Sequence, residues 1–216
     1  MTEESELTTA SAKLGVQTPR PVLVLVGAAA SLDPELAECV LPLFTQTVVP
    51  IIAQCGALAI DGGTDYGVMA LLGRARGRAG VDFPLLGVAA SGTLAPPAGD
   101  AAQGARLNPD HSGYLLVPGN HWGDEVPWIS ALATTIAGDA GSVTLAIGGG
   151  AITERDIATS LASGRPTILL TETGPLSERL RRQPLPGLRF IPFSQAAERL
   201  AKEVPPLLRP GQTVGD

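Results

Sequence analysis

The chain has 216 residues and a formal net charge of -6, with 44% apolar but only 4% aromatic residues. This length suits one well-buried domain and is short for two. Because a nucleic-acid surface needs concentrated basic charge, we expect no nucleic-acid partner. The aliphatic, alanine-rich composition favours helices packed closely on a sheet, as in an α/β layer structure.

The first strand must be distinguished from a secretory signal. Residues 1–18 start acidic and show no sustained period, which predicts a disordered tail. The apolar run 22–26 is followed by small residues, but Asp33-Pro34-Glu35 then supplies an N-cap, a first-turn proline and a first-turn acid. We therefore assign this run to the first buried strand.

We expect a single domain over residues 19–204 and a frayed end over 205–216. No segment is expected to be long and apolar enough to cross a bilayer. The protein is accordingly predicted to be cytoplasmic, with no direct membrane insertion. Cys39 and Cys55 have no His or second Cys at metal-site spacing, so no metal site is expected.

Short apolar runs alternate with amphipathic stretches along the domain. Strands are expected at 22–26, 57–60, 84–89, 114–117, 143–147 and 166–171. Helices are expected at 34–54, 65–78, 125–137, 154–162, 175–182 and 195–203. This alternation predicts a Rossmann-like, doubly wound and mainly parallel sheet in three αβα layers.

The segment 90–110 is rich in Ala, Gly and Pro and has neither helical nor strand period. A loop of this length in a compact domain is either functional or disordered. Because it leaves the end of an expected strand, we keep two interpretations, a lid over a ligand and a disordered connection.

Two glycine-rich turns follow expected strands, Gly62-Gly63-Thr64 and Gly148-Gly149-Gly150. Glycines let the backbone approach a ligand, and the N–H groups at a following helix start can bind an anion. Thr153 and Asp156 in the second turn also fit a variant of the capping box. Two such turns at one edge of a parallel sheet nevertheless favour a ligand site.

These turns carry a family resemblance. Gly-Gly-x-x-x-Gly-Val-Met at 62–69 and Gly-Gly-x-x-Thr-x-x-Asp at 149–156 resemble signatures of the Lonely Guy (LOG) nucleoside-monophosphate phosphoribohydrolases. Together with 86–89, 107–117 and 122–125, they are more similar to the LSDAT branch of the SLOG superfamily. That branch comprises prokaryotic relatives of the nucleotide-binding cytosolic region of melastatin-type TRP channels (TRPM).

The resemblance covers roughly residues 22–178 and implies a site for a nucleotide-derived ligand such as ADP-ribose, AMP or an NAD-related molecule. A divalent metal bridging the ligand's phosphates is left open. The ligand-binding residues that it implies, together with those from the glycine turns, are Gly27, Ala28, Gly62, Gly63, Thr64, Asp65, Gly67, His111, Trp122, Gly148, Gly149, Gly150, Ala151, Ile152, Thr153 and Gly174.

The chain departs from the hydrolytic signature at several points. Asp156 stands where the hydrolases carry a catalytic glutamate, so its carboxylate is one methylene shorter. Ile152 replaces a glycine, the leading proline is absent, and the segment ending in Gly174 lacks the expected arginine. These departures favour binding over hydrolysis, with Asp156 as the candidate catalytic residue if activity remains.

Several side chains have two interpretations. His111 and His121 could serve acid/base or phosphate-binding roles, or be structural loop residues. Trp122 could stack on a purine or anchor its loop. Asp65 could stabilise its helix start or face a ribose hydroxyl. Asp124 and Glu125 are expected to cap the next helix.

The leading hypothesis is therefore a regulatory module that senses a nucleotide-like ligand, with a homo-oligomeric state and a separate effector protein as further expectations. The alternative is an N-glycosidic hydrolase in which Asp156 stabilises positive charge on the sugar. A third hypothesis is a self-associating structural domain with a vestigial site.

Overall fold

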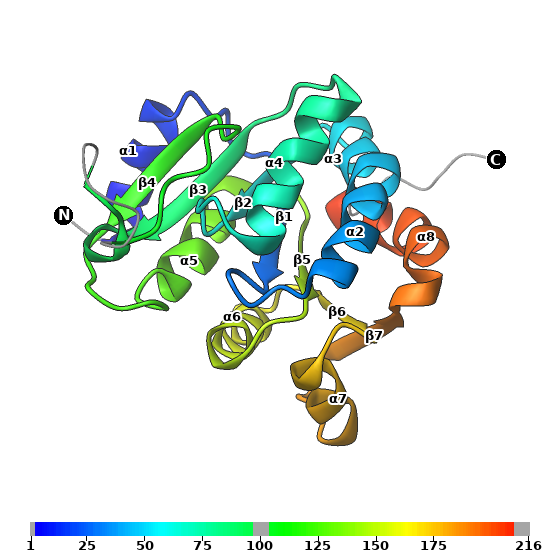
Figure 1. The fold of residues 1–216 in the computed structure, drawn as a ribbon. Helices are drawn as coiled ribbons and strands as arrows, with labels where there is room; N and C mark the ends of the chain where they lie inside the picture. The colour runs from blue at the N-terminus through cyan, green and yellow to red at the C-terminus, as the bar shows by residue number, and fades with distance from the viewer. Residues whose placement is uncertain (1–2, 97–103, 210–216) are drawn as a thin grey trace.

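The computed structural model describes residues 3–96 and 104–209. Within them, seven parallel strands form one sheet in the order β4-β3-β2-β1-β5-β6-β7 (Figure 1). The strands are β1 (Val22–Gly27), β2 (Leu58–Asp61), β3 (Leu85–Ala90), β4 (Gly113–Val117), β5 (Ser142–Ile147), β6 (Thr167–Thr171) and β7 (Leu188–Pro192). The predicted doubly wound α/β fold is confirmed.

Helices cover both faces of this sheet. One layer contains α2 (Pro34–Leu43), η1 (Phe44–Val48), α3 (Val49–Gln54), α4 (Gly67–Ala79) and α8 (Ala196–Leu208). The other contains α1 (Glu3–Lys13), α5 (Val126–Ala137), α6 (Ala151–Ala162) and α7 (Pro175–Arg182). Short 3₁₀ turns η2 (Ser91–Thr93) and η4 (Phe193–Gln195) complete the described elements.

Strand β1 shows why two cores form. Its side chains alternate between the faces of the sheet, so Leu23 and Leu25 enter the core beneath α2 and α4. Val22, Val24 and Val26 enter the core beneath α5 and α6. A strand that is apolar on both faces is typical of a parallel sheet covered by helices on both sides.

The structure differs from the sequence prediction at both ends of the domain. The expected tail 1–18 contains helix α1, because Leu7 and Val16 are buried in the core that also holds α5. Helix α8 continues through Pro205 and Pro206 to Leu208, which is fully buried, although fraying was expected from residue 205. Residues 210–216 lie outside the described residues. Strand β7 was also missing from the prediction.

The helical run Pro34–Gln54 requires a second correction. It has 21 residues and a mean hydropathy of 1.7, so by length and composition alone it could cross a membrane, contrary to the prediction. The same test is passed by core helices of globular domains, and here Phe44, Val48 and Ile52 are buried in the core with at most 1% exposure. The π-helical segment η1 lies between Pro42 and Pro50, and the run stays helical through both prolines.

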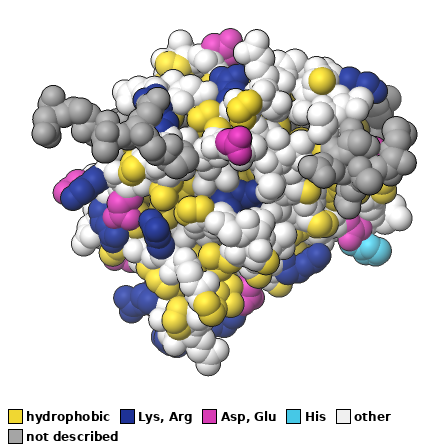
Figure 2. All heavy atoms as spheres, turned by 180° about the vertical axis from the view of Figure 1, so that it is seen from behind, with side chains coloured by type: hydrophobic (Ala, Val, Ile, Leu, Met, Phe, Trp, Pro, Cys, Tyr) yellow, Lys and Arg dark blue, Asp and Glu magenta, His cyan; other side chains and the backbone are white. Residues whose placement is uncertain are grey.

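Charges of both signs are interspersed on the face seen in Figure 2. Arginine and lysine side chains lie among acidic ones rather than in a separate basic area. This face therefore carries no separate basic area among its described residues.

A buried arginine joins the ends of α5 and α6. Arg165 is 3% exposed and donates to Ser130 O at 2.9 Å and Thr134 Oγ1 at 2.9 Å in α5. It also lies 3.4 Å from Ser160 Oγ in α6. Both helices end beside this guanidinium, so their partial negative charges stabilise it. Burial lowers the pKa of Arg165 to about 10, which leaves it charged at neutral pH.

Replacing Arg165 should therefore destabilise the fold. We expect Arg165→Ala to lower the free energy of unfolding by about 2–4 kcal/mol, because buried hydroxyls lose their partner and a void remains. Urea denaturation measures this loss. The control is Arg182→Ala at an exposed position, which should change stability by less than about 0.5 kcal/mol. Equal effects of the two variants would contradict this role.

Candidate functional site

A cavity of about 730 Å³ lies where the carboxyl ends of the strands meet the helices. The turns after β1, β2 and β5 line it, together with the first residues of α6 and the loop before α5. The chain winds outward from β1 to β4 in one direction and from β5 to β7 in the other. The cavity therefore lies at the topological switch point between β1 and β5, where doubly wound folds bind ligands.

The structure brings most of the predicted site residues to this cavity. Those lining it are Gly27, Ala28, Gly62, Thr64, Trp122, Gly149, Gly150, Ala151, Ile152, Thr153 and Asp156. The others do not line it: Gly63, Asp65, Gly67, His111, Gly148 and Gly174.

The start of α6 forms one wall of the cavity. Helix α6 begins at Ala151 with Gly150 as its N-cap, three residues before the predicted start. Thr153 is thus inside the first turn and does not serve as the N-cap of a capping box. The first N–H groups of a helix have no partner within it and carry partial positive charge. This wall can therefore donate hydrogen bonds to an anionic group.

Close packing explains two glycines beside the cavity. Gly149 has φ +95°, and a Cβ there would lie 2.1 Å from Thr153 Oγ1. Gly67 has φ +51°, and its Cβ would lie 2.0 Å from Ala28 O. Gly67 thus lets α4 pack on the turn after β1, where Val68 N donates to Ala28 O at 3.0 Å. Both glycines allow the turns to approach one another.

Gly148 is held from the neighbouring strand. Its N–H donates to Thr173 Oγ1 at 3.0 Å, and that hydroxyl donates to Leu170 O at 2.7 Å. Thr173 follows β6 in the segment that lacks the arginine of the hydrolases, just before Gly174. This segment therefore positions the second glycine turn without lining the cavity.

Asp156 lies one turn inside α6 and lines the cavity while being only 8% exposed. Its Oδ1 is buried with no hydrogen-bond partner in the described part of the chain. Burial raises the pKa of this carboxyl to about 8; the nearby Glu125 carboxyl adds to the rise and the Arg155 guanidinium opposes it. At neutral pH Asp156 is therefore mostly protonated and uncharged.

Glu125 is a second acidic residue of the cavity, and the sequence analysis did not assign it to the site. It directly precedes α5, but its side chain does not cap that helix. Its Oε2 instead accepts from Gly123 N at 2.9 Å. Burial raises the pKa of this carboxyl, while backbone N–H groups, including that of Gly123, lower it. The cavity thus contains two carboxyl groups whose pKa is raised by burial.

Asp156 gives a testable pH dependence. An acid whose folded-state pKa exceeds its unfolded value of about 4 binds its proton more tightly when folded, so stability falls as pH rises from about 4 to about 8. We expect Asp156→Asn to flatten this loss and to exceed the parent's stability at pH 9 by a few kcal/mol, on the order set by the pKa difference. Denaturation at pH 4, 7 and 9 measures the slopes.

Glu154→Gln is the matched control on the same helix. In the parent protein, the hydrogen bond from Arg179 lowers the pKa of Glu154. Glu154→Gln should therefore not flatten the loss of stability between pH 4 and 8. If Asp156→Asn retained the full pH slope of the parent protein, the buried carboxyl would not be its source.

His111 lies outside the cavity lining, within a buried network. Its side chain and that of Asp61 are both 0% exposed, with His111 Nε2 at 2.8 Å from Asp61 Oδ1. His111 Nδ1 lies 3.2 Å from Asn108 Oδ1. That amide oxygen also accepts from Asp110 N at 3.0 Å, and Asn108 Nδ2 donates to Asp65 Oδ1, which fixes the amide's orientation.

Both ring nitrogens of His111 therefore face acceptors. The ring thus joins Asp61 to Asn108, and its contact with the Asp61 carboxyl group is the shorter of the two. Asp61 Oδ1 also accepts from Gly63 N at 2.7 Å, and Asn108 N donates to Gly63 O at 2.9 Å. The network thus fixes the first glycine turn through hydrogen bonds to Gly63, and His111 itself does not line the cavity.

The segment around this network also joins the cavity. Asp65 N donates to Arg106 O, and Leu107 pairs with Thr64 through an antiparallel bridge. Gly104 and Ala105 line the cavity. This part of the predicted 90–110 loop is therefore ordered against the site, while residues 97–103 lie outside the described residues.

Removing the imidazole should leave Asp61 buried and unpaired. We expect His111→Phe to cost about 3–5 kcal/mol of stability, and His111→Phe with Asp61→Asn to cost less than the sum of the two single changes. Urea denaturation of this double-mutant cycle measures the coupling. His121→Phe is the control, because the His121 side chain is 87% exposed. Additive effects would argue against a His111–Asp61 ion pair.

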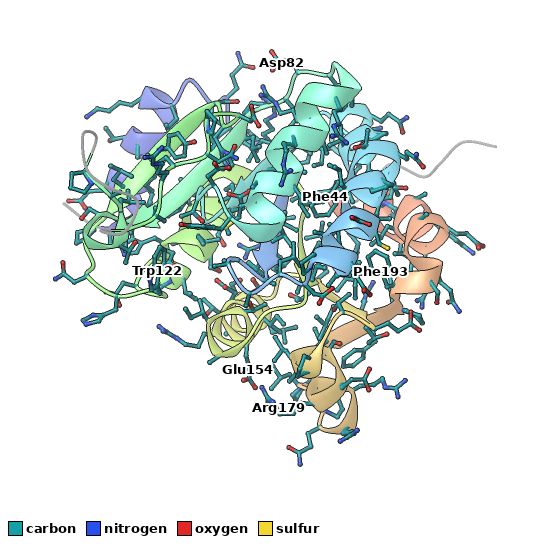
Figure 3. All side chains as sticks on the ribbon, in the orientation of Figure 1. Phe44, Asp82, Trp122, Glu154, Arg179 and Phe193 are labelled. Carbon is teal, nitrogen blue, oxygen red and sulfur yellow. The ribbon has the colours of Figure 1, made fainter. Side chains whose placement is uncertain are left out.

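Trp122 extends the cavity toward solvent. It lies in the loop before α5 and is 50% exposed (Figure 3). A half-exposed indole at a cavity edge offers a flat surface on which a planar ring can stack. Ile152, 37% exposed, adds a second apolar side chain at the start of α6.

Sequence reasoning missed most apolar lining residues because they continue the elements that it identified. These apolar residues are Leu25, Val26, Ala30, Tyr66, Met69, Ala105 and Ile129. Glu125, Ser31 and Gly104 also line the cavity and were not predicted. Met69 is 8% exposed and contacts both core and cavity. The position directly after β1 could have indicated Ala30 and Ser31.

The fold and cavity define a Rossmann-like domain with a ligand-sized pocket at its topological switch point. The chain belongs to the prokaryotic family described as SLOG in TRPM (LSDAT), whose model matches residues 20–203. This match confirms the resemblance inferred from the two glycine turns. No curated protein matches the sequence.

Solved structures share the fold. The molybdenum cofactor binding protein from the phototrophic bacterium Rippkaea orientalis superposes with a TM-score of 0.61 at 16% identity, over 87% of this chain and 99% of that protein. The molybdenum cofactor carrier protein from Chlamydomonas reinhardtii gives a TM-score of 0.54 at 17% identity, over 84% and 96% of the two chains.

Proposed function

We propose that this protein binds a phosphate-bearing, nucleotide-derived ligand, such as ADP-ribose or an NAD-related molecule, as a sensing or regulatory module. The observation that carries the proposal is the cavity of about 730 Å³, in which the N-terminus of α6 meets three turns at the sheet's switch point. A phosphate would lie against the N–H groups of residues 150–153, and Trp122 would stack on the base.

The charge state of Asp156 supports binding over hydrolysis. A protonated carboxyl does not repel a phosphate and can donate a hydrogen bond to it. It also cannot stabilise positive charge on a sugar, which the hydrolytic alternative assigned to this residue. A hydrolase remains the second candidate function, because a buried acid with a pKa of about 8 could instead protonate a departing base.

Family and fold leave the ligand's identity to experiment. Two proteins of this fold are named for binding or carrying the molybdenum cofactor, so that cofactor joins ADP-ribose and AMP as a ligand to be tested. Homo-oligomerisation, a cytoplasmic location and a separate effector protein remain parts of the proposal.

Anion binding at the N-terminus of α6 can be tested by introducing a negative charge at the first residue of the helix. Ala151 is exposed and begins the helix. In Ala151→Glu, the new carboxylate should stabilise the helix start by about 0.5 kcal/mol and weaken binding of an anionic ligand about tenfold or more. Ala151→Gln is the neutral control of equal size. Calorimetric titration with ADP-ribose gives affinity, and thermal melting gives stability.

Because Ala151→Glu should raise stability while weakening ligand binding, a loss of affinity cannot be explained by unfolding. Equal affinities of the two variants would mean that no anion binds at the start of α6. A proton NMR time course with ADP-ribose and AMP then distinguishes the two functions. Line broadening without new signals indicates binding alone, whereas growing signals of free base or ribose phosphate, abolished in Asp156→Asn, indicate a hydrolase.

A further inference from the structure

The cavity lining contains acidic side chains and lacks basic ones that could pair with the phosphate of the proposed ligand, within the residues that the structure describes. Its described lining residues include the acids Glu125 and Asp156 but no Lys, Arg or His. A phosphate in the cavity would thus meet backbone N–H groups on one side and two carboxyl groups on the other. Two acids close to a bound anion repel it unless protons or a cation neutralise them.

The carboxyl groups also retain unused acceptor capacity. Asp156 is only 8% exposed, and its Oδ1 has no partner within residues 3–96 and 104–209. Glu125 uses Oε2 to accept from Gly123 N. Arg155, the nearest basic residue that acts on both acids, is exposed and does not line the cavity. A buried acceptor without a donor points to a missing ligand atom or ion.

We propose that a divalent cation such as Mg²⁺ binds between Asp156, Glu125 and the phosphate oxygens of the bound ligand. This inference rests on the proposed function. Mg²⁺ is commonly held by one or two carboxylates and by the substrate's phosphates, with water completing its octahedron. Such a cation would neutralise the charge between the two acids and the phosphate.

The site is incomplete without the ligand. No group of three or more His, Cys, Asp or Glu side chains suited to a metal is present in the described part of the chain. Cation and ligand should therefore bind cooperatively, each raising the affinity of the other by the same factor. The protein alone should bind Mg²⁺ weakly.

The test is calorimetric titration of ADP-ribose in buffer with Mg²⁺ and in buffer with EDTA at equal ionic strength. We expect binding to be about tenfold tighter, or more, with Mg²⁺. Asp156→Asn and Glu125→Gln should each reduce this ratio of affinities to near one. Mg²⁺ also binds free ADP-ribose, but that effect is the same for the parent protein and the variants, so comparing their ratios corrects for it. Glu154→Gln is the matched control: this α6 acid faces Arg179 of α7 outside the cavity (Figure 3).

A second measurement needs no variant. Electron paramagnetic resonance of Mn²⁺ with the unaltered protein should show cation affinity rising by the same factor when ADP-ribose is added. Equal ADP-ribose affinity in Mg²⁺ and EDTA would overturn the cation site while leaving the proposed function intact. Proton uptake on binding without a cation effect would likewise overturn it. Failure to bind ADP-ribose, AMP or the molybdenum cofactor in either buffer would overturn both proposals.

Discussion

The parallel pairing of β1 with β5 is the constraint on which the site depends. Gly27 at the end of β1 is in register with Ile147 at the end of β5, so the two following turns leave the sheet side by side. From these strands the chain winds in opposite directions, and no crossover helix fills the space between the turns. The cavity and the exposed start of α6 both follow from this arrangement.

Two sets of buried polar side chains stabilise the elements around the cavity. The His111–Asp61 pair fixes the Gly62–Thr64 turn because Asp61 accepts from Gly63 N, and the neighbouring Asn108 N donates to Gly63 O. Arg165 joins the far ends of α5 and α6, the two helices whose starts carry Glu125 and the glycine wall. The hydrogen-bond partners of Asp61 and Arg165 come from separate segments of the chain, so these bonds fix the relative positions of those segments, although Asp61 Oδ2 has no partner in the described chain.

The sequence predicted the sheet and the glycine turns because both depend on local patterns. Apolar runs that end in glycine identify β2 and β5, and the family match from 20 to 203 confirms that interpretation. Helix α1 was missed because its acidic start has little amphipathic character, and tertiary contacts of Leu7 stabilise it. Pro205 suggested fraying, yet burial of Leu208 outweighs the cost of prolines in α8.

Side-chain roles depended on contacts that no local pattern contains. His111 matched the family pattern and was assigned to the ligand, but its partners Asp61 and Asn108 lie behind the turn. Glu125 was interpreted as a cap because it precedes a helix, whereas the fold of the 122–125 loop directs it to the cavity. A contact between segments 50 residues apart decides the first case, and the conformation of a single loop decides the second.

The shorter acid at position 156 connects these observations. Side chains on a helix point toward its N-terminus, so a residue one turn inside α6 reaches the cavity only as far as its length allows. The shorter aspartate keeps its carboxyl group buried in the cavity lining. Burial there raises the pKa of the carboxyl to about 8, and one of its oxygens has no hydrogen-bond partner in the described chain. A glutamate would carry the same group one methylene further from the helix. We infer that losing this methylene changes a reacting carboxylate into a buried group that takes up a proton or a cation with the ligand.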